Sequence, residues 1–322
     1  MIVPVLRELE KHYPEVKLTV LTRKFFKPFF RDLKNVFVFE ADVKGRHKGA
    51  QGLYKLSKEL KLLNIDAVAD LHNVLRSNFL KLFFVGIPFI QINKGRKEKR
   101  ALVTGKLFKQ LKTTHQRYTD VFNKLEFNIN LDNPVFPVKS KLDDQTLEVI
   151  GNDFKPLIGI APFAAFESKI YPISLIEKVV NELSKNYTIL LFGGGKIETE
   201  ILDALSNKFK NTFNLAGKLN LNQELDVISN LEVMIAMDSG NAHMAAMLGI
   251  EVITLWGVTH PFAGFYPFNQ NPDNALIADR TKYPKIPTSI YGNKYPESYK
   301  NAIVSISPQH IVKKTLSIIK KA

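Results

Sequence analysis

The sequence predicts an α/β protein with two Rossmann-like, doubly wound domains that face a cleft. Strand-like runs of branched apolar residues alternate with amphipathic helical stretches, a pattern typical of parallel sheets covered by helices on both faces. This alternation occurs twice, and a polar stretch with two prolines separates the two series. We therefore expect a first domain over residues 1–150, a second over residues 151–322, and a linker over about 128–155.

The first alternating series begins with a helix. Val3, Leu6 and Leu9 recur at helical spacing, and Tyr13-Pro14 ends the helix. The segments that follow predict strand, strand, helix, strand, helix and strand. They are VKLTVLT (16–22), VFVFE (36–40), AQGLYKLSKELKLLN (50–64), DAVADLH (66–72), VLRSNFLKLFF (74–84) and GIPFIQI (86–92).

The second alternating series begins with a strand. Its strands are PLIGIAP (156–162), YTILLFGGG (187–195), TFNLAG (212–217), EVMIAMD (232–238), EVITLWG (251–257) and ALIAD (275–279). Its helices are ISLIEKVVNELSKN (173–186), ETEILDALSNKF (198–209), NQELDVISN (222–230) and NAHMAAMLG (241–249). This order predicts a second parallel sheet.

Composition excludes several classes of protein. The chain has no cysteine, which excludes a disulfide framework and a thiolate metal site. The longest apolar run, NFLKLFFVGIPFIQI, is interrupted by Lys81, Gly86 and Pro88, so it is not a membrane span. We find no signal peptide either, and a cytoplasmic location fits these features.

The net charge of +14 is unevenly distributed. Residues 1–150 hold 28 Lys and Arg against 16 Asp and Glu, whereas residues 151–322 hold 17 against 15. An excess confined to one half suggests an anionic partner, which could be nucleic acid, a membrane surface or a phosphorylated substrate. Nucleic acid is the weakest of these, because no helix-turn-helix, zinc finger or aromatic RNA-binding motif accompanies the basic runs.

Ligands of doubly wound sheets bind at the carboxyl ends of the strands, against helix N-termini. A strand ends before Asp238, and Ser239 and Gly240 turn the chain into a helix near Asn241. Ser239 can cap that helix, whose exposed N–H groups would hold a phosphate, while Asp238 would accept hydrogen bonds from an attached sugar. Alternatively, Asp238 is only a cap, and His243 is only a packed core histidine.

Two further strand ends can contribute to the same site. Lys169 follows the strand that ends at Ala161 and can neutralise a diphosphate. Gly193, Gly194 and Gly195 follow a buried strand and allow a nucleotide to approach the backbone, where Glu198 could accept from ribose hydroxyls. A single lysine and a triple glycine are each signals of low specificity.

Together these motifs resemble glycosyltransferase family nine, the heptosyltransferases that build the inner core of lipopolysaccharide. DSGNAHMAAMLGIEVITLWGVTHP (238–261) resembles the family signature, with Glu251 in place of the usual proline. The segments that match other parts of the family are PVLRELEKHYPEVKLTVLT (4–22), DLHNVLRSNFL (70–80), APFAAFESKIYP (161–172) and NLAGKLNLNQELDVISNLEVMIAMD (214–238). The resemblance implies a GT-B fold whose final helix, residues 307–321, crosses back onto the first domain.

The resemblance also implies roles for individual residues. Lys169 would bind the donor diphosphate and Asp238 the sugar, both as catalytic residues. The remaining donor-binding residues would be Gly193 and Gly194 in the glycine loop, Glu198 at the ribose, Leu219 over the adenine, Asn241, and Ser239, Gly240 and His243 at the phosphates. Ala164, Ala165 and Tyr171 depart from the family pattern, so the nucleotide and the sugar stay open.

The implied reaction is an inverting, metal-independent transfer of a heptose, or a related sugar, from a nucleotide-diphosphate donor such as ADP-heptose to the anionic lipopolysaccharide core. No Asp-x-Asp metal motif occurs in the sequence, and we expect no cofactor. Two alternatives stay open: the same fold with another nucleotide-sugar donor, and a catalytically silent sugar-nucleotide-binding paralogue.

The general base of the family is an Asp in a Gly-Asp turn before the first helix. MIVPVLRELEKHYP resembles the family segment that follows this turn, so Met1 falls where the turn should be. We therefore expect an N-terminally shortened chain without the first strand and the base, and its own activity stays open. Without that residue, Asp70 and His72 are the first candidates for the base.

Overall fold

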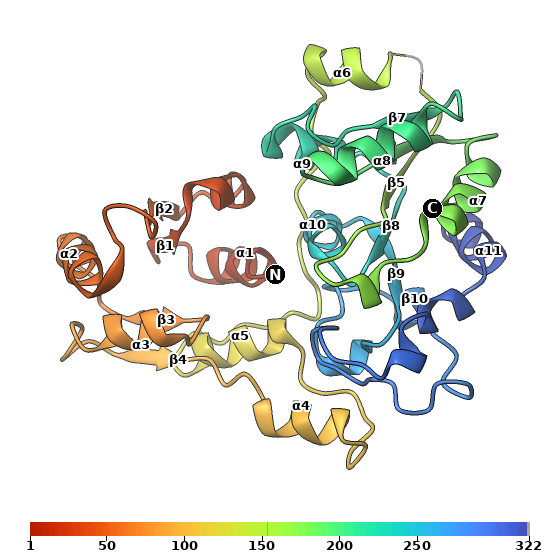
Figure 1. Cartoon of the computed structure of the whole chain (residues 1–322). Coiled ribbons are helices and arrows are strands. Elements are labelled where there is room, and N and C mark those ends of the chain that lie inside the picture. Colours follow the sequence, from red (N-terminus) through yellow and green to blue (C-terminus); the bar gives the residue numbers. More distant parts are fainter. Residues whose placement is uncertain (153, 321–322) are drawn as a thin grey trace. The chain divides into compact units, whose positions relative to one another are not determined.

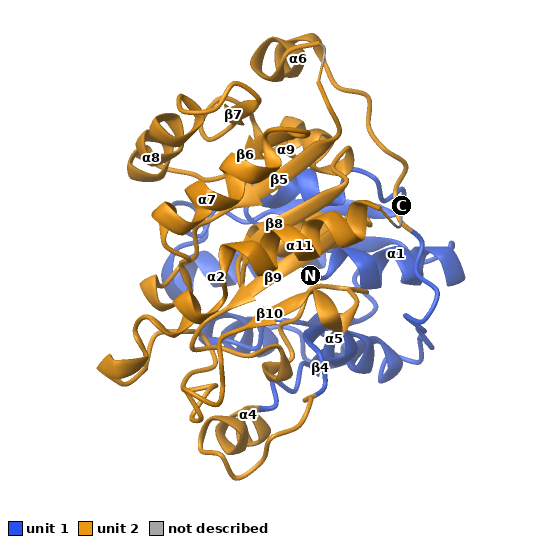
Figure 2. Cartoon of the chain, turned by 90° about the vertical axis from the view of Figure 1, so that its right-hand side faces the viewer, with its two compact units in different colours: residues 1–95, 112–135 blue, residues 96–111, 136–322 orange. Residues whose placement is uncertain are grey.

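The structure, a computed structural model, describes residues 1–152 and 154–320. Contacts divide the chain into two compact units (Figure 2): unit 1 comprises residues 1–95 and 112–135, and unit 2 comprises residues 96–111 and 136–322. Residue 153, in the expected linker, and residues 321–322, at the end of the last expected helix, lie outside the described residues. The expected domain boundary near residue 150 remains a prediction.

Unit 1 contains four helices, four strands and one 3-10 helix among its described residues (Figure 1). The helices are α1 (Val3–His12), α2 (Gly49–Lys61), α3 (Leu75–Lys81) and α5 (Thr114–Asn123), and the 3-10 helix is η1 (Lys24–Phe30). The strands are β1 (Leu18–Thr22), β2 (Val36–Glu40), β3 (Val68–Asp70) and β4 (Phe89–Gln91).

The strands of unit 1 form two separate parallel pairs, β1 with β2 and β3 with β4, rather than the single sheet we expected. The reason is that no strand of the described residues pairs with the second edge of β1 or β3. The core beside these pairs is supplied by α2 and α3, where Leu53, Leu56 and Leu60 pack with Leu80 and Phe84.

Unit 2 contains a six-stranded parallel sheet, in the order β10-β9-β8-β5-β6-β7. Its strands are β5 (Leu157–Ala161), β6 (Thr188–Leu191), β7 (Thr212–Asn214), β8 (Val233–Met237), β9 (Glu251–Trp256) and β10 (Ala275–Ile277). Its α-helices are α4 (Arg96–Val103), α6 (Asp144–Ile150), α7 (Ile173–Leu183), α8 (Lys196–Ser206), α9 (Leu221–Ser229), α10 (Gly240–Met247) and α11 (Pro308–Ile319). Its 3-10 helices are η2 (Glu167–Lys169), η3 (Pro261–Ala263), η4 (Pro272–Asn274), η5 (Glu297–Tyr299) and η6 (Ala302–Ser305).

Helices cover both faces of the unit 2 sheet (Figure 2). Alternate strand residues share one apolar cluster with α7, α8 and α11, whereas α10 packs with α9 and on β8 and β9. Because both faces are covered, every residue of β5, β6 and β8 is buried. This explains why their sequences read as continuous apolar runs rather than alternating ones.

The observed elements follow most of the expected ones. The helix expected from Val3 to His12 has those bounds, and every predicted strand is present. The expected linker contains the short helix α6, which Asp143 caps by accepting a hydrogen bond from the Thr146 backbone N–H. The last helix packs against α7 within unit 2, and its expected crossing back onto the first domain remains a prediction.

Segment 96–111 belongs to unit 2, although the sequence places it in the first half. Leu102 and Leu111 pack with Ala263 in one apolar cluster, and the Leu111 N–H donates to the Phe262 carbonyl. This segment carries six basic residues and one acidic residue. Counted by unit, the charge excess is therefore +8 in unit 1 and +6 in unit 2, which is far more even than the split by sequence halves.

None of the described helices combines the length and the apolar character that crossing a lipid bilayer would require.

Candidate functional site

The order of strands in unit 2 favours a ligand site between β5 and β8. The chain runs outward from β5 through β6 to β7, then returns to β8 on the other side of β5 and runs outward through β9 to β10. At such a switch point, the loops after the two central strands turn to opposite faces and leave a crevice for ligands. Lys169 lies in the loop after β5, and Asp238 directly follows β8.

Lys169 and Asp238 form an ion pair at this switch point. Lys169 Nζ lies 3.0 Å from Asp238 Oδ2, and the Thr259 hydroxyl donates to the same oxygen at 3.1 Å. Lys169 and Asp238 are each only 9% exposed, and Thr259 is fully buried. The sequence predicts Lys169 and Asp238 as separate site residues, but it predicts neither their pairing nor the role of Thr259. Because the charges are mostly removed from water, deleting one partner leaves the other uncompensated.

Gly292 confines the stem of Lys169. A Cβ at Gly292 would lie 2.6 Å from Lys169 Cδ, and Gly292 has a φ of +89°, which favours glycine. The Ser168 hydroxyl donates to the Gly292 carbonyl, tying the end of η2 to this segment. Sequence reasoning missed Ser168 and Gly292, because nothing in the irregular stretch around Gly292 marks it as a neighbour of residues 124 positions earlier.

The first turn of α10 carries buried polar atoms without a partner. Ser239 Oγ and His243 Nδ1 have no hydrogen-bond partner among the described residues. Ser239 occupies the N-cap position, yet its side chain makes no capping hydrogen bond, which corrects the expected capping role. Neither a positive φ nor a close neighbour requires glycine at Gly240. These features fit a helix N-terminus that binds an anion.

His243 is uncharged in this environment. Burial lowers the pKa of its imidazole to about 3, and the positive charge of Lys169 contributes in the same direction. A neutral imidazole can donate one hydrogen bond from one ring nitrogen and accept one at the other. His243 can therefore contribute a hydrogen bond to a ligand, but not a positive charge.

The three glycines after β6 differ in whether the local structure requires glycine at their positions. A Cβ at Gly193 would lie 2.9 Å from a Leu202 methyl, and Gly195 has a φ of +78°, so both are required structurally. Gly194 has neither constraint, and its N–H donates to Glu198 Oε2 at 2.8 Å. Around Gly194 there is thus open space in which a ligand could approach the backbone. The ribose contact of Glu198 remains a prediction.

The other expected donor-binding residues lie at the same edge of the sheet. Leu219 is half-buried in the connection between β7 and α9, and Asn241 is half-buried in the first turn of α10. Tyr171, where the family usually has tryptophan, is fully buried, and its hydroxyl donates to the Ile306 carbonyl at 2.6 Å. Tyr171 therefore supports the core beneath the Lys169 loop rather than facing a ligand.

Asp70, a candidate base in unit 1, is occupied by structural hydrogen bonds. Its Oδ1 accepts from the backbone N–H groups of His72 and Asn73, and its Oδ2 accepts from Gln91 at 2.9 Å. Burial alone would raise the pKa of Asp70, but these hydrogen bonds and one from Ser77 outweigh it and lower the pKa. A carboxylate held in this way is a weak proton acceptor.

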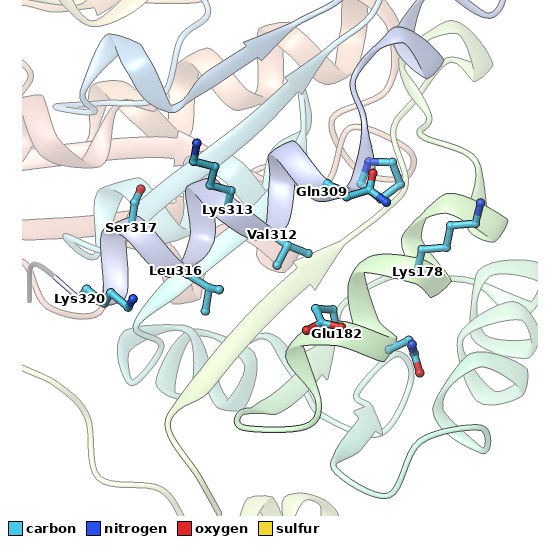
Figure 3. A pocket seen from close by; sticks show the side chains of 10 residues that line it. Lys178, Glu182, Gln309, Val312, Lys313, Leu316, Ser317 and Lys320 are labelled. Atoms are coloured by element: carbon cyan, nitrogen blue, oxygen red, sulfur yellow. The ribbon is translucent and has the colours of Figure 1, made fainter.

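A groove of about 670 Å³ lies between α7 and α11 (Figure 3). Lys178 and Glu182 of α7 face Gln309, Val312 and Leu316 of α11 across it. It is formed by the sides of two helices, away from the carboxyl ends of the strands. None of its lining residues is among the predicted site residues, and we assign the site to the strand ends.

Comparison with solved structures identifies the fold. A family 9 glycosyltransferase from Veillonella parvula matches over 100% of this chain and 93% of its own, with a TM-score of 0.75 and 17% identity. An E. coli heptosyltransferase WaaC solved with ADP matches over 98% of this chain and 94% of its own, with a TM-score of 0.69 and 16% identity. The fold is that of the GT-B glycosyltransferases.

Sequence comparison then identifies the family. The model of glycosyltransferase family 9 (heptosyltransferase) matches residues 53–293. The lipooligosaccharide heptosyltransferase 2 of Haemophilus influenzae is 30% identical over 278 residues, which cover 79% of this chain and 78% of that protein. The chain belongs to glycosyltransferase family 9, and the family assignment made from its motifs is confirmed.

Proposed function

We propose that this chain transfers a heptose from ADP-heptose to the core of lipopolysaccharide, with inversion at the anomeric carbon and without a metal ion. The observation that carries the donor assignment is a row of residues along the carboxyl edge of the unit 2 sheet. Asp238, Lys169, Glu198 and Leu219 follow β8, β5, β6 and β7, which are adjacent in that order. With strands about 4.8 Å apart, the row spans roughly 14 Å, which suits an extended nucleoside diphosphate sugar.

The order of residues in this row matches the order of groups in the donor. Asp238 would accept hydrogen bonds from the sugar, Lys169 would bind the diphosphate, Glu198 the ribose, and Leu219 would cover the base. Ser239 Oγ and the N-terminus of α10 would donate to the phosphate oxygens, which would supply the buried Ser239 hydroxyl with the partner it lacks.

The ion pair has a direct role in this scheme. A bound diphosphate would compete with Asp238 for Lys169, and sugar hydroxyls would take the place of the lysine at Asp238. In the transition state, negative charge grows on the leaving diphosphate, and Lys169 with the α10 N-terminus would stabilise it. This positive charge is what makes a metal ion unnecessary in the proposed reaction.

The acceptor is proposed to be the anionic core of lipopolysaccharide, met at the inner face of the inner membrane from the cytoplasm. Relatives that carry the name lipooligosaccharide heptosyltransferase support this acceptor class. The excess of basic residues, present in both units, supports an anionic partner.

Calorimetry with a panel of donors tests this proposal. We expect ADP-heptose to bind more tightly than UDP- or GDP-sugars, and purified core acceptor to gain one heptose with inverted anomeric configuration, equally well in EDTA. Tighter binding of another nucleotide-sugar would replace the donor. Binding without transfer, in a chain whose fold is intact, would instead favour a silent sugar-nucleotide-binding paralogue.

A further inference from the structure

The outward face of α3 carries apolar side chains where a surface helix ordinarily carries polar ones. Leu75 is 86% exposed, and Leu82, directly after the helix, is 66% exposed. They are seven residues apart, so they project from the same side, two helical turns apart. Leu80 and Phe84 point the opposite way, into the core shared with α2. Leu75 and Leu82 therefore lie on the solvent side of α3, opposite the side that packs into the core.

This apolar surface continues from α3 onto α2. The rings of Phe79 and Phe83 lie 5.5 Å apart, and the rings of Phe83 and Tyr54 also lie 5.5 Å apart. Tyr54 is 48% exposed on α2. Phe79 and Phe83 are half-buried and also pack against the core shared by α2 and α3. We call Tyr54, Leu75, Phe79, Leu82 and Phe83 the α3 face. It includes part of the longest apolar run of the sequence, which is too short and too interrupted to span a membrane.

Basic side chains surround the α3 face. Arg76 and Lys81 are exposed on either side of the two leucines, and Lys58 places its Nζ 4.7 Å from the centre of the Tyr54 ring. Within α2 and α3 the single acidic residue is Glu59, whose Oε2 accepts from Arg46 at 3.0 Å. The face thus combines exposed apolar tips with a border of positive charge.

We propose that the α3 face docks onto an anionic lipid bilayer, with Leu75 and Leu82 inserted among the headgroups and Arg76 and Lys81 bound to lipid phosphates. Aliphatic tips bordered by cations are what an interfacial membrane surface requires. Single-stranded nucleic acid would need open aromatic faces for stacking, whereas Phe79 and Phe83 meet edge to face.

The position of α3 links this surface to the proposed function. The helix begins five residues after the end of β3, so its first turn lies near the carboxyl edge of the β3–β4 pair, where parallel sheets bind ligands. A protein docked by this face would bring that edge to the bilayer that holds its lipid acceptor. This inference rests on the proposed function, because it names the surface that would meet the proposed acceptor. Binding to vesicles can nevertheless be measured independently of sugar transfer.

The absence of cysteine allows a direct test in the full chain. Leu82→Cys, labelled with a polarity-sensitive fluorophore, should show a blue shift on vesicles of phosphatidylcholine with phosphatidylglycerol, and none on phosphatidylcholine alone. Val138→Cys, at a still more exposed site in unit 2, is the control and should not respond. Leu75→Ser with Leu82→Ser should lower vesicle partitioning at least about tenfold. Arg76→Gln with Lys81→Gln should lower it about fivefold for each charge removed.

Further measurements separate this proposal from its rivals. ADP-heptose binding should be the same in the leucine variants as in the wild type. If the wild type itself did not bind ADP-heptose, the donor assignment would be refuted, while the vesicle result would still stand. Phe25→Ser changes another exposed apolar side chain of unit 1, on η1. If only this variant lost vesicle binding, the α3 face would be the wrong surface. Vesicle binding that ignored the leucines, or preferential binding of RNA, would overturn the proposal.

Discussion

Unit 2 buries its strands completely, whereas unit 1 leaves its strands partly exposed. Every residue of β5 and β8 is buried, but β1 and β2 contain no fully buried residue. The difference follows from the sheets: β5 and β8 have neighbours on both edges and helices on both faces, while β1 pairs with one strand among the described residues. The central strands of unit 2 are therefore covered by other elements of the same unit, whereas β1 and β2 of unit 1 keep part of their surface exposed.

This difference separates two kinds of functional evidence. In unit 2, η2 and the end of β8 hold Lys169 Nζ and Asp238 Oδ2 3.0 Å apart, so a site can be argued from geometry. In unit 1, the informative features are surfaces: exposed leucines and basic side chains. We therefore expect substitutions at the strand ends of unit 2 to change chemistry and donor binding, and substitutions on exposed surfaces to change how the protein meets its partners.

The largest effect is expected at the ion pair of unit 2. Asp238→Ala should lower the transfer rate about 10²–10³-fold, while the affinity for ADP is kept or increased, because Lys169 loses the carboxylate that competes with the diphosphate. Lys169→Ala should lower both the transfer rate and the affinity for ADP. Steady-state kinetics and calorimetry with ADP measure the two quantities.

A matched control for these variants is Lys208→Ala, which removes the exposed ion pair with Glu177 at 2.8 Å in the same unit. It should leave transfer and ADP affinity unchanged, since exposed pairs contribute little. If Lys169→Ala bound ADP as tightly as the wild type does, the proposal that the diphosphate binds at Lys169 would be wrong.

The second effect concerns the stability of the two units. Backbone amides of β8 should exchange with solvent at least about 100-fold more slowly than those of β1, because opening β8 exposes the unit 2 core while β1 can open locally. Hydrogen exchange followed by mass spectrometry measures this difference peptide by peptide. Equal protection in both strands would contradict the contrast drawn from their burial.

Element order could be predicted from the sequence because it depends on local periodicity. The helix from Val3 to His12 and the strands of unit 2 follow from the spacing of apolar residues. Local periodicity does not say which core a helix joins. Segment 96–111 therefore seemed to belong with the first half, although Leu102 and Leu111 pack with Ala263.

The site could be predicted only in part for a similar reason. Lys169 and Asp238 are found because each follows a predicted strand, and strand ends of a parallel sheet meet at one edge. Their direct pairing depends on η2, and the confinement of Lys169 depends on Gly292, both in irregular segments without a period. Thr259 is missed because a hydroxyl beside a carboxylate has no sequence signature.

The third prediction concerns a carboxyl that limits the stability of unit 2. Burial raises the pKa of Glu224, in the first turn of α9, from 4.5 to about 7. Below pH 4.5 the group is protonated in both the folded and the unfolded chain. As pH rises from there to about 7, the unfolded chain releases a proton that the folded chain keeps, so stability falls by about 1–3 kcal/mol in total.

Glu224→Gln should therefore raise the melting temperature well above pH 7, and the gain should vanish near pH 4. Asp226→Asn, two residues further along α9, is a nearby comparison of the same chemical change. Thermal unfolding at a series of pH values measures both. A gain for Glu224→Gln that did not depend on pH would show that its carboxyl is not the group responsible.

The smallest effect is expected from charge reversal on α4, the basic helix that the structure assigns to unit 2. Arg96, Lys97 and Arg100 are exposed, whereas Lys99 is buried with its Nζ 4.0 Å from the centre of the Phe265 ring and must be kept. Changing the three exposed residues to Glu should raise the acceptor KM several-fold and leave ADP affinity unchanged. The effect should fade in high salt, because exposed charges are screened over about 8–10 Å at ordinary ionic strength. A change in ADP affinity instead would mean that α4 serves the donor site of its own unit, and that recognition of the anionic acceptor depends on the surfaces of unit 1.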